Sequence, residues 1–143
     1  MKKVLSILIV VLFGTFSMSC SQAQNPAKNS NSTAKVEVFY FHATNRCATC
    51  LAVEENAKKT LEQNFKSQLG DRTIKFASYN IDEEANKALA EKYEIVFSTL
   101  LIIKMDGTKE IKTDFTDIAF QYAHTNPAKY AELLKAEIEK NLK

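Results

Sequence analysis

Two cysteines three residues apart carry the most evident chemistry in this chain. Cys47 and Cys50 form a Cys-x-x-Cys motif at the point where an apolar run, 36–41, gives way to a helical pattern. A helix N-terminus exposes unpaired backbone N–H groups and a positive partial charge. Both stabilise a thiolate, which is the reactive form of cysteine. The motif therefore predicts a redox site in which Cys47 is the nucleophile and Cys50, one turn deeper, closes a disulfide with it.

Residues around the motif offer supporting groups. Arg46 directly precedes Cys47, and a cation at that point favours the thiolate. His42 ends the preceding apolar run and is a candidate proton relay or third soft ligand, although a histidine at a strand end needs no such role. Glu54 and Glu55 follow the motif and could accept protons, but charged residues on an exposed helix face need no special explanation.

The N-terminal segment has the pattern of an export signal. Lys2 and Lys3 precede a continuous apolar stretch, 4–16, which is too short for a stable membrane-spanning helix. Ser17-Met18-Ser19-Cys20 then resembles the lipobox of bacterial lipoproteins, in which the cysteine becomes the lipidated N-terminus. The usual Leu or Val is replaced by Ser17, and ordinary cleavage to a soluble protein is the alternative. We expect a signal peptide over 1–19 and a lipid on Cys20. This lipid would hold the protein on the periplasmic side of the envelope.

The rest of the chain divides into a tether and one domain. Residues 20–34 are polar and predict a flexible tether, and residues 35–143 suit one domain of common size. Loss of Lys2 and Lys3 with the signal leaves 17 of the 19 basic residues, against 17 acidic ones. No basic surplus remains, so we expect no nucleic-acid partner. With Cys20 lipidated, Cys47 and Cys50 are the two cysteines left to pair with each other, and a four-cysteine metal cluster is excluded. We expect a redox-active disulfide and no other cofactor or metal.

Hydrophobic periodicity and turn residues predict the elements of this domain. They are a central strand over 35–42, a helix over 47–69, a strand over 73–81, a short helix up to Tyr93, a strand over 96–105, its hairpin partner over 109–115, a segment over 118–124 compatible with a short helix, and a last helix from 127. Parallel strands joined by helices, closed by a hairpin and a final helix, predict an α/β sandwich around one mixed sheet.

Local signals mark several boundaries of these elements. Asn80 and Glu83 have the spacing of a capping box for the short helix. Asp106-Gly107 is a strong signal for a two-residue hairpin turn. Asn126-Pro127 has the residue types of an N-cap and first helical position, and so predicts the start of the last helix.

The domain resembles the thioredoxin superfamily over residues 35–143. That family has this element order and a Cys-x-x-Cys opening the first helix. Lys92-Tyr93-Glu94-Ile95, followed by the segment 99–107, is similar to the family's Tyr-Gly-Ile turn, Pro-Thr-Leu, apolar strand and Asn-Gly or Asp-Gly hairpin. The resemblance implies a thioredoxin-like three-layer sandwich and thiol–disulfide exchange by Cys47 and Cys50. It also implies that Ser98 and Thr99 lie beside the cysteines.

Three departures from the family pattern concern the substrate and the proton. Ser98 replaces the family's cis-proline. A non-proline cis bond costs about 2.5–4 kcal/mol, so this peptide is either a strained cis bond or, as we expect, trans with an altered substrate edge. Thr44-Asn45-Arg46 replaces the usual Trp before the first cysteine. Tyr40 and Phe41 stand where the family has a buried acid. We therefore expect peptide recognition and proton handling to differ from the family.

The leading hypothesis is a thiol–disulfide oxidoreductase of the bacterial cell envelope. Its partners would be the disulfide or thiol of a client protein and a membrane electron donor. Ala48-Thr49 contains no basic residue or proline, which favours a reductant. Two alternatives stay open: a thiolate carrier of Cu(I) or a metalloid, and a non-catalytic thioredoxin-like interaction module with a permanently oxidised cysteine pair.

Overall fold

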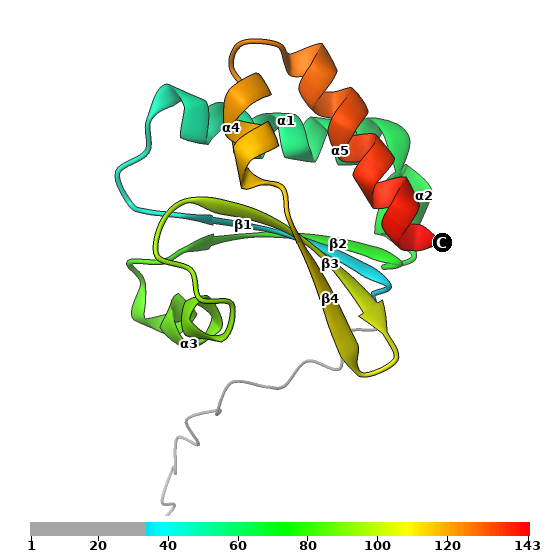
Figure 1. The fold of residues 1–143 in the computed structure, drawn as a ribbon, viewed down its shortest axis with the longest axis horizontal. Helices are drawn as coiled ribbons and strands as arrows, with labels where there is room; N and C mark the ends of the chain where they lie inside the picture. The colour runs from blue at the N-terminus through cyan, green and yellow to red at the C-terminus, as the bar shows by residue number, and fades with distance from the viewer. Residues whose placement is uncertain (1–33) are drawn as a thin grey trace, which may run out of the picture. The chain divides into compact units, whose positions relative to one another are not determined.

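The computed structural model describes residues 34–143. Its elements are β1 (Val36–His42), α1 (Ala48–Asn64), α2 (Lys66–Gly70), β2 (Ile74–Asn80), α3 (Glu84–Lys92), β3 (Thr99–Asp106), β4 (Lys109–Asp114), α4 (Thr116–Tyr122) and α5 (Pro127–Leu142). Figure 1 shows their arrangement. The predicted signal peptide, Cys20 and the predicted tether up to residue 33 lie outside the described residues. Ala34, the last residue of the predicted tether, is described and is buried.

The four strands form one mixed sheet in the order β2-β1-β3-β4. β1 pairs with β2 in parallel and with β3 in antiparallel orientation, and β4 is antiparallel to β3. This confirms the mixed sheet and the central position of β1, but β3 does not run parallel to β1 as expected. Asn80 pairs with His42 and Thr99 pairs with Phe41. Because β2 ends and β3 begins at the same end of β1, β3 must run back along it.

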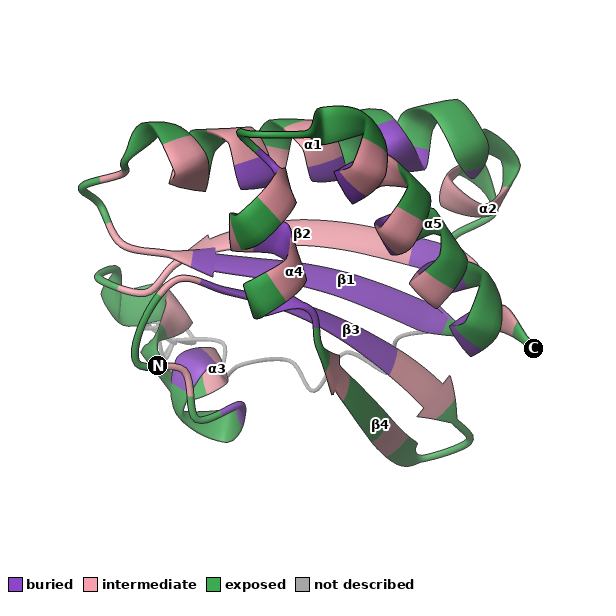
Figure 2. Ribbon diagram, turned by 45° about the horizontal axis from the view of Figure 1, so that its top comes forward, coloured by how far each residue is buried: buried purple, intermediate pink, exposed green. Residues whose placement is uncertain are grey.

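Helices cover both faces of this sheet and make three layers. α1, α2, α4 and α5 lie on one face and α3 on the other (Figures 1 and 2). The side chains of β1 alternate between two apolar clusters, as a strand buried on both faces requires. The larger cluster packs the sheet against α1, α4 and α5 and includes Val38, Leu61, Leu134 and Ile138. The smaller one, on the side of α3, combines the aromatic residues Phe39, Phe41 and Tyr93 with Leu101 and Ile103. The predicted fold class, an α/β three-layer sandwich, is confirmed.

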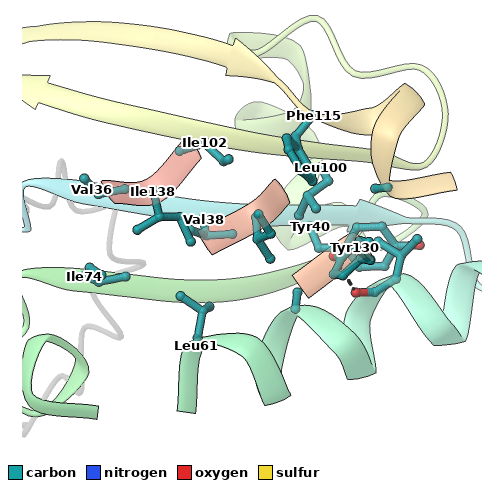
Figure 3. Close-up of a cluster of buried hydrophobic side chains, with 14 of the residues drawn as sticks. Val36, Val38, Tyr40, Leu61, Ile74, Leu100, Ile102, Phe115, Tyr130 and Ile138 are labelled. Carbon is teal, nitrogen blue, oxygen red and sulfur yellow. Dashed lines mark hydrogen bonds between the residues drawn. The ribbon is translucent and has the colours of Figure 1, made fainter. Parts of the chain in front are cut away.

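Tyrosine hydroxyls connect the larger cluster to the backbone of α1. The Tyr130 hydroxyl of α5 donates to the carbonyl oxygen of Val53 at 3.0 Å. Tyr40 of β1 lies at the same end of the cluster (Figure 3). Both side chains are fully buried, and each ring contributes apolar surface while its hydroxyl finds a partner. These contacts fix α1 above the sheet along its first turns.

Several boundaries differ from those expected. The helix predicted over 47–69 is broken at Phe65, which has φ −133° and ψ 29° and is buried, so the backbone leaves helical geometry to keep this side chain in the core. The capping box at Asn80 does not form: the N-cap of α3 is Glu83, and the Asn80 side-chain oxygen accepts from the Asp82 N–H instead. β3 begins at Thr99, not at 96. In contrast, Asn126 caps α5 by accepting from the Lys129 N–H, as predicted.

The hairpin between β3 and β4 turns at Gly107, as the sequence indicated. Asp106 pairs with Lys109 across the turn, and Gly107 has φ +62°, a left-handed conformation that glycine adopts without a steric penalty. Within residues 34–143, none of the helices is long and apolar enough to cross a bilayer.

Leu134→Ala tests the packing of α5 on the sheet. Because Leu134 is fully buried in the larger cluster, we expect the free energy of unfolding in urea to fall by about 2–5 kcal/mol. Lys135→Ala, at the neighbouring half-exposed position, should change it by less than about 0.5 kcal/mol. Equal effects of the two substitutions would contradict the burial of this helix face.

Candidate functional site

The two cysteines lie at the first turn of α1, beyond the end of β1. Cys47 is the N-cap residue, with φ −79° and ψ 168°, and its sulfur accepts a hydrogen bond from the Cys50 N–H at 3.2 Å. Its side chain thus does what an N-cap oxygen does in most helices. Both cysteines are free thiols, with the two Sγ atoms 2.7 Å apart. Cys47 is exposed and Cys50 is half-buried, so an incoming group meets Cys47 first.

The surroundings of Cys47 favour its thiolate. A hydrogen bond from the Cys50 thiol, followed by one from the Cys50 backbone N–H, lowers the pKa of Cys47 below its ordinary value of 9.0. The backbone N–H groups of Thr49 and of Cys47 itself act in the same direction. These are the unpaired donors of a helix N-terminus, as the position of the motif predicted.

The loop that delivers Cys47 is fastened to the end of β2. The Thr44 N–H donates to the Asp82 carboxylate at 2.7 Å, and the Asn80 side-chain amide donates to the Thr44 hydroxyl at 3.0 Å. The backbone hydrogen bond from Thr44 lowers the pKa of Asp82. Thr44 and Asn45, which replace the tryptophan of the family pattern, therefore belong to an anchored loop.

Arg46 lies beneath the motif, with a side chain that is 17% exposed. One guanidinium nitrogen, Nη2, donates to the Cys50 carbonyl oxygen at 3.0 Å. The other, Nη1, lies 2.5 Å from the Glu54 carboxylate, and Cζ is 5.5 Å from the centroid of the Tyr40 ring. The groups that lower the pKa of Cys47 are the neighbouring thiol and backbone N–H groups. Arg46 thus contacts the backbone of Cys50, whereas the sequence suggested an effect on Cys47.

Tyr40 makes a second contact with the same carbonyl group. Its hydroxyl donates to the Cys50 carbonyl oxygen at 3.0 Å. Burial raises the pKa of Tyr40 to about 12, and Cys50 adds to the shift, whereas hydrogen bonds from Arg46 and Ser98 oppose it. Ser98 therefore lies beside Tyr40 under the motif. Residues 34–143 contain no cis peptide bond, so the peptide before Ser98 is trans, as expected.

His42 and Thr99 have their contacts elsewhere. His42 Nδ1 lies 2.9 Å from the Ala43 carbonyl oxygen, which can only accept, so this nitrogen carries the proton. The ring lies near Tyr40, with the centroids 5.8 Å apart. The Thr99 hydroxyl donates to the Phe97 carbonyl oxygen at 2.9 Å and is buried at the start of β3. His42 is thus the last residue of β1 and Thr99 the first residue of β3, and their polar side-chain contacts are with neighbouring backbone carbonyl groups.

Two residues of the site were not predicted from the sequence, namely Tyr40 and Glu54. The sequence indicates Tyr40 only as a replacement of the family's buried acid. It favours an exposed helix face for Glu54, but this side chain is 13% exposed and is bound by Arg46 and Lys58. Burial alone would raise the pKa of Glu54, but hydrogen bonds from Lys58 and Arg46 outweigh it and lower the pKa. A signal was present: Glu54 follows Cys50 by one helical turn, which puts it on the same helix face.

The structure adds no ligand to the two thiolates for a metal. Across residues 34–143, no group of three His, Cys, Asp or Glu side chains is placed to hold an ion.

The pH dependence of alkylation tests whether the Cys50 thiol and the backbone N–H groups together stabilise the Cys47 thiolate. The rate of Cys47 alkylation by iodoacetamide should rise with pH and reach half its plateau below pH 9.0. Cys50→Ala removes the thiol hydrogen bond but leaves the backbone N–H groups, so its midpoint should move toward 9.0. Cys47→Ser is the control for background labelling of Cys50. A midpoint at or above 9.0 in the unmodified protein would contradict this account.

The chain was compared with family models, curated proteins and solved structures. No family model and no curated protein matches the chain. Similar solved structures include oxidised mitochondrial thioredoxin 3 from Saccharomyces cerevisiae (21% identity over 73% of this chain and 81% of that one, TM-score 0.46). They also include chloroplastic thioredoxin z, with 21% identity over 76% of this chain and 82% of that one and a TM-score of 0.46. Fasciola hepatica thioredoxin has 20% identity over 72% of this chain and 81% of that one, with a TM-score of 0.45. By its own strand order, helix positions and cysteine placement, the chain has the thioredoxin-like fold.

Proposed function

We propose that this protein is a thiol–disulfide oxidoreductase that reduces disulfides of client proteins. The observation that carries the proposal is the environment of the cysteine pair. An exposed Cys47 with a lowered pKa lies 2.7 Å from the sulfur of Cys50 within one helical turn. A buried structural disulfide would need neither exposure nor thiolate stabilisation, and a bridge across so short a loop adds little to stability.

The reaction has two exchange steps. The Cys47 thiolate attacks one sulfur of the client disulfide, which forms a mixed disulfide and releases one client thiolate. The Cys50 thiol then loses its proton and attacks the Cys47 sulfur. This forms the Cys47–Cys50 disulfide, breaks the mixed disulfide and releases the second client thiolate. Two electrons pass from the protein dithiol to the client.

A complete cycle needs a donor that returns these two electrons. In our proposal a dithiol protein of the membrane supplies them. Its thiolate attacks the Cys47–Cys50 disulfide, which returns both cysteines to thiols and leaves the donor's own two cysteines joined in a disulfide. We propose that the protein reduces its clients because the residues between the cysteines, Ala48 and Thr49, carry no positive charge. A cation there would stabilise the thiolate form of the pair and make the protein a stronger oxidant.

The surface around the cysteines is suited to protein clients. Leu51 directly follows Cys50 and is 51% exposed. Val96 and Phe97 are 80% and 62% exposed, and they precede Ser98, which lies close enough to Tyr40 to act on the pKa of its hydroxyl. Exposed apolar side chains that gather near a reactive group favour contact with a partner. The client we propose therefore presents apolar residues next to its disulfide.

Cys50→Ala should trap the client. Without the resolving thiol, the mixed disulfide on Cys47 persists, because its release needs attack by Cys50. Cells that express this variant should accumulate adducts that disappear on reduction and are absent from Cys47→Ala/Cys50→Ala. Failure to trap an adduct, with Cys47 of the variant still fully alkylated at a pH above its own midpoint, would exclude the exchange mechanism.

We also propose that the protein is attached to the periplasmic side of the envelope by a lipid on Cys20. The support is the basic start, the apolar stretch and the small residues before this cysteine. Lipid labelling with a radioactive fatty acid should mark the wild-type protein and not Cys20→Ala. Labelling of both proteins, or of neither, would contradict the anchor.

A further inference from the structure

Arg46 has three different contacts within one turn of the reactive pair. Its guanidinium donates to the Cys50 carbonyl oxygen, pairs with the Glu54 carboxylate and lies over the Tyr40 ring. The planar fork of arginine allows the first two at once, from Nη2 and Nη1. Lysine, with one nitrogen, is a point charge and does not reproduce this geometry.

The energetics argue that Arg46 is not present for stability. Its side chain is 17% exposed, and its Nε is buried and has no hydrogen-bond partner in the part of the chain that the structure describes. A buried donor without a partner destabilises the folded state. Ion pairs withdrawn from water are often no better for stability than well-packed apolar residues. What the arginine provides and an apolar residue could not is a directed hydrogen bond to the Cys50 carbonyl.

Glu54 holds Arg46 in this orientation. Glu54 follows Cys50 by one turn of α1, and its side chain is 13% exposed. Its carboxylate receives Arg46 at Oε2 and Lys58 at Oε1, the latter at 2.6 Å. The Arg46–Glu54 pair therefore connects the loop before Cys47 to the second turn of α1, with the Cys50 backbone between them.

We propose that Arg46, held by Glu54, is a positioning residue for Cys50 in the second exchange step. The pair fixes the backbone that carries the resolving thiol within reach of the Cys47 sulfur. Attack by Cys47 on the client relies instead on the Cys50 thiol and the backbone N–H groups of the helix start. This inference rests on the proposed exchange function. It predicts that loss of the pair slows the second step and leaves the first step unchanged.

A small aromatic disulfide separates the two steps. The reduced full chain, kept in detergent, is mixed with dithiobis(nitrobenzoate) in a stopped-flow instrument. The first coloured thiolate is released when Cys47 attacks, at a rate proportional to reagent concentration. The second is released when Cys50 resolves the mixed disulfide, at a rate independent of it. Urea midpoints of all variants show whether each is folded.

Arg46→Gln and Glu54→Gln should slow the second release about fivefold, the size of a coupling of about 1 kcal/mol between contacting residues, and change the first by less than about twofold. The double variant should be no slower than Arg46→Gln, because the two residues act as a unit. Arg46→Lys should resemble Arg46→Gln. Glu55→Gln, at the adjacent exposed position, should leave both rates unchanged.

The outcomes separate the inference from the function on which it rests. A second release as fast in both single variants as in the wild type, or a slowing of both steps to the same extent, would overturn the positioning role. Additive effects in the double variant would also overturn it. If the wild type releases no second thiolate at all, Cys50 does not resolve and the proposed function itself fails. Should Arg46→Gln not fold, Glu54→Gln carries the test, since it keeps the guanidinium.

Discussion

The hydrogen bonds to the Cys50 carbonyl oxygen join the parts of this structure that the site needs. Tyr40 reaches it from the central strand, and Arg46 reaches it from the loop before α1. Through this atom the sheet, the loop and the helix are fixed to one another at the residue that carries the second thiol. Tyr130, which binds the Val53 carbonyl from α5, extends the same arrangement along α1.

The same contacts limit how a proton can leave Cys50. Tyr40, with a pKa of about 12, does not accept a proton near neutral pH, because its neutral hydroxyl is already the stable form. Glu54 is held as a carboxylate by Lys58 and Arg46, and its lowered pKa makes it a weak base. Neither residue replaces the buried acid of the family pattern. In the exchange that we propose, water or the departing client thiolate then takes the proton, since Cys50 is half-buried and reachable.

The sequence could predict what is decided locally. The turn at Gly107 and the cap at Asn126 follow from residue type and near neighbours, and the burial of β1 follows from an unbroken apolar run. It could not predict the pairing of Arg46 with Glu54, because the direction of a long side chain depends on how the loop and helix pack. The break at Phe65 is similar, since a buried ring overrode helical periodicity there.

The asymmetry of the cysteine pair follows from these contacts. Cys47 is exposed and caps the helix with its own sulfur, so its thiolate is stabilised where a client can reach it. Cys50 is half-buried, and its carbonyl group is bound by Tyr40 and Arg46. Two thiols of the same type thus acquire different tasks, since one is free to meet a partner and the other is held beside it. In the exchange that we propose, the order of the two steps is therefore determined by backbone and side-chain contacts, before any property of the client is considered.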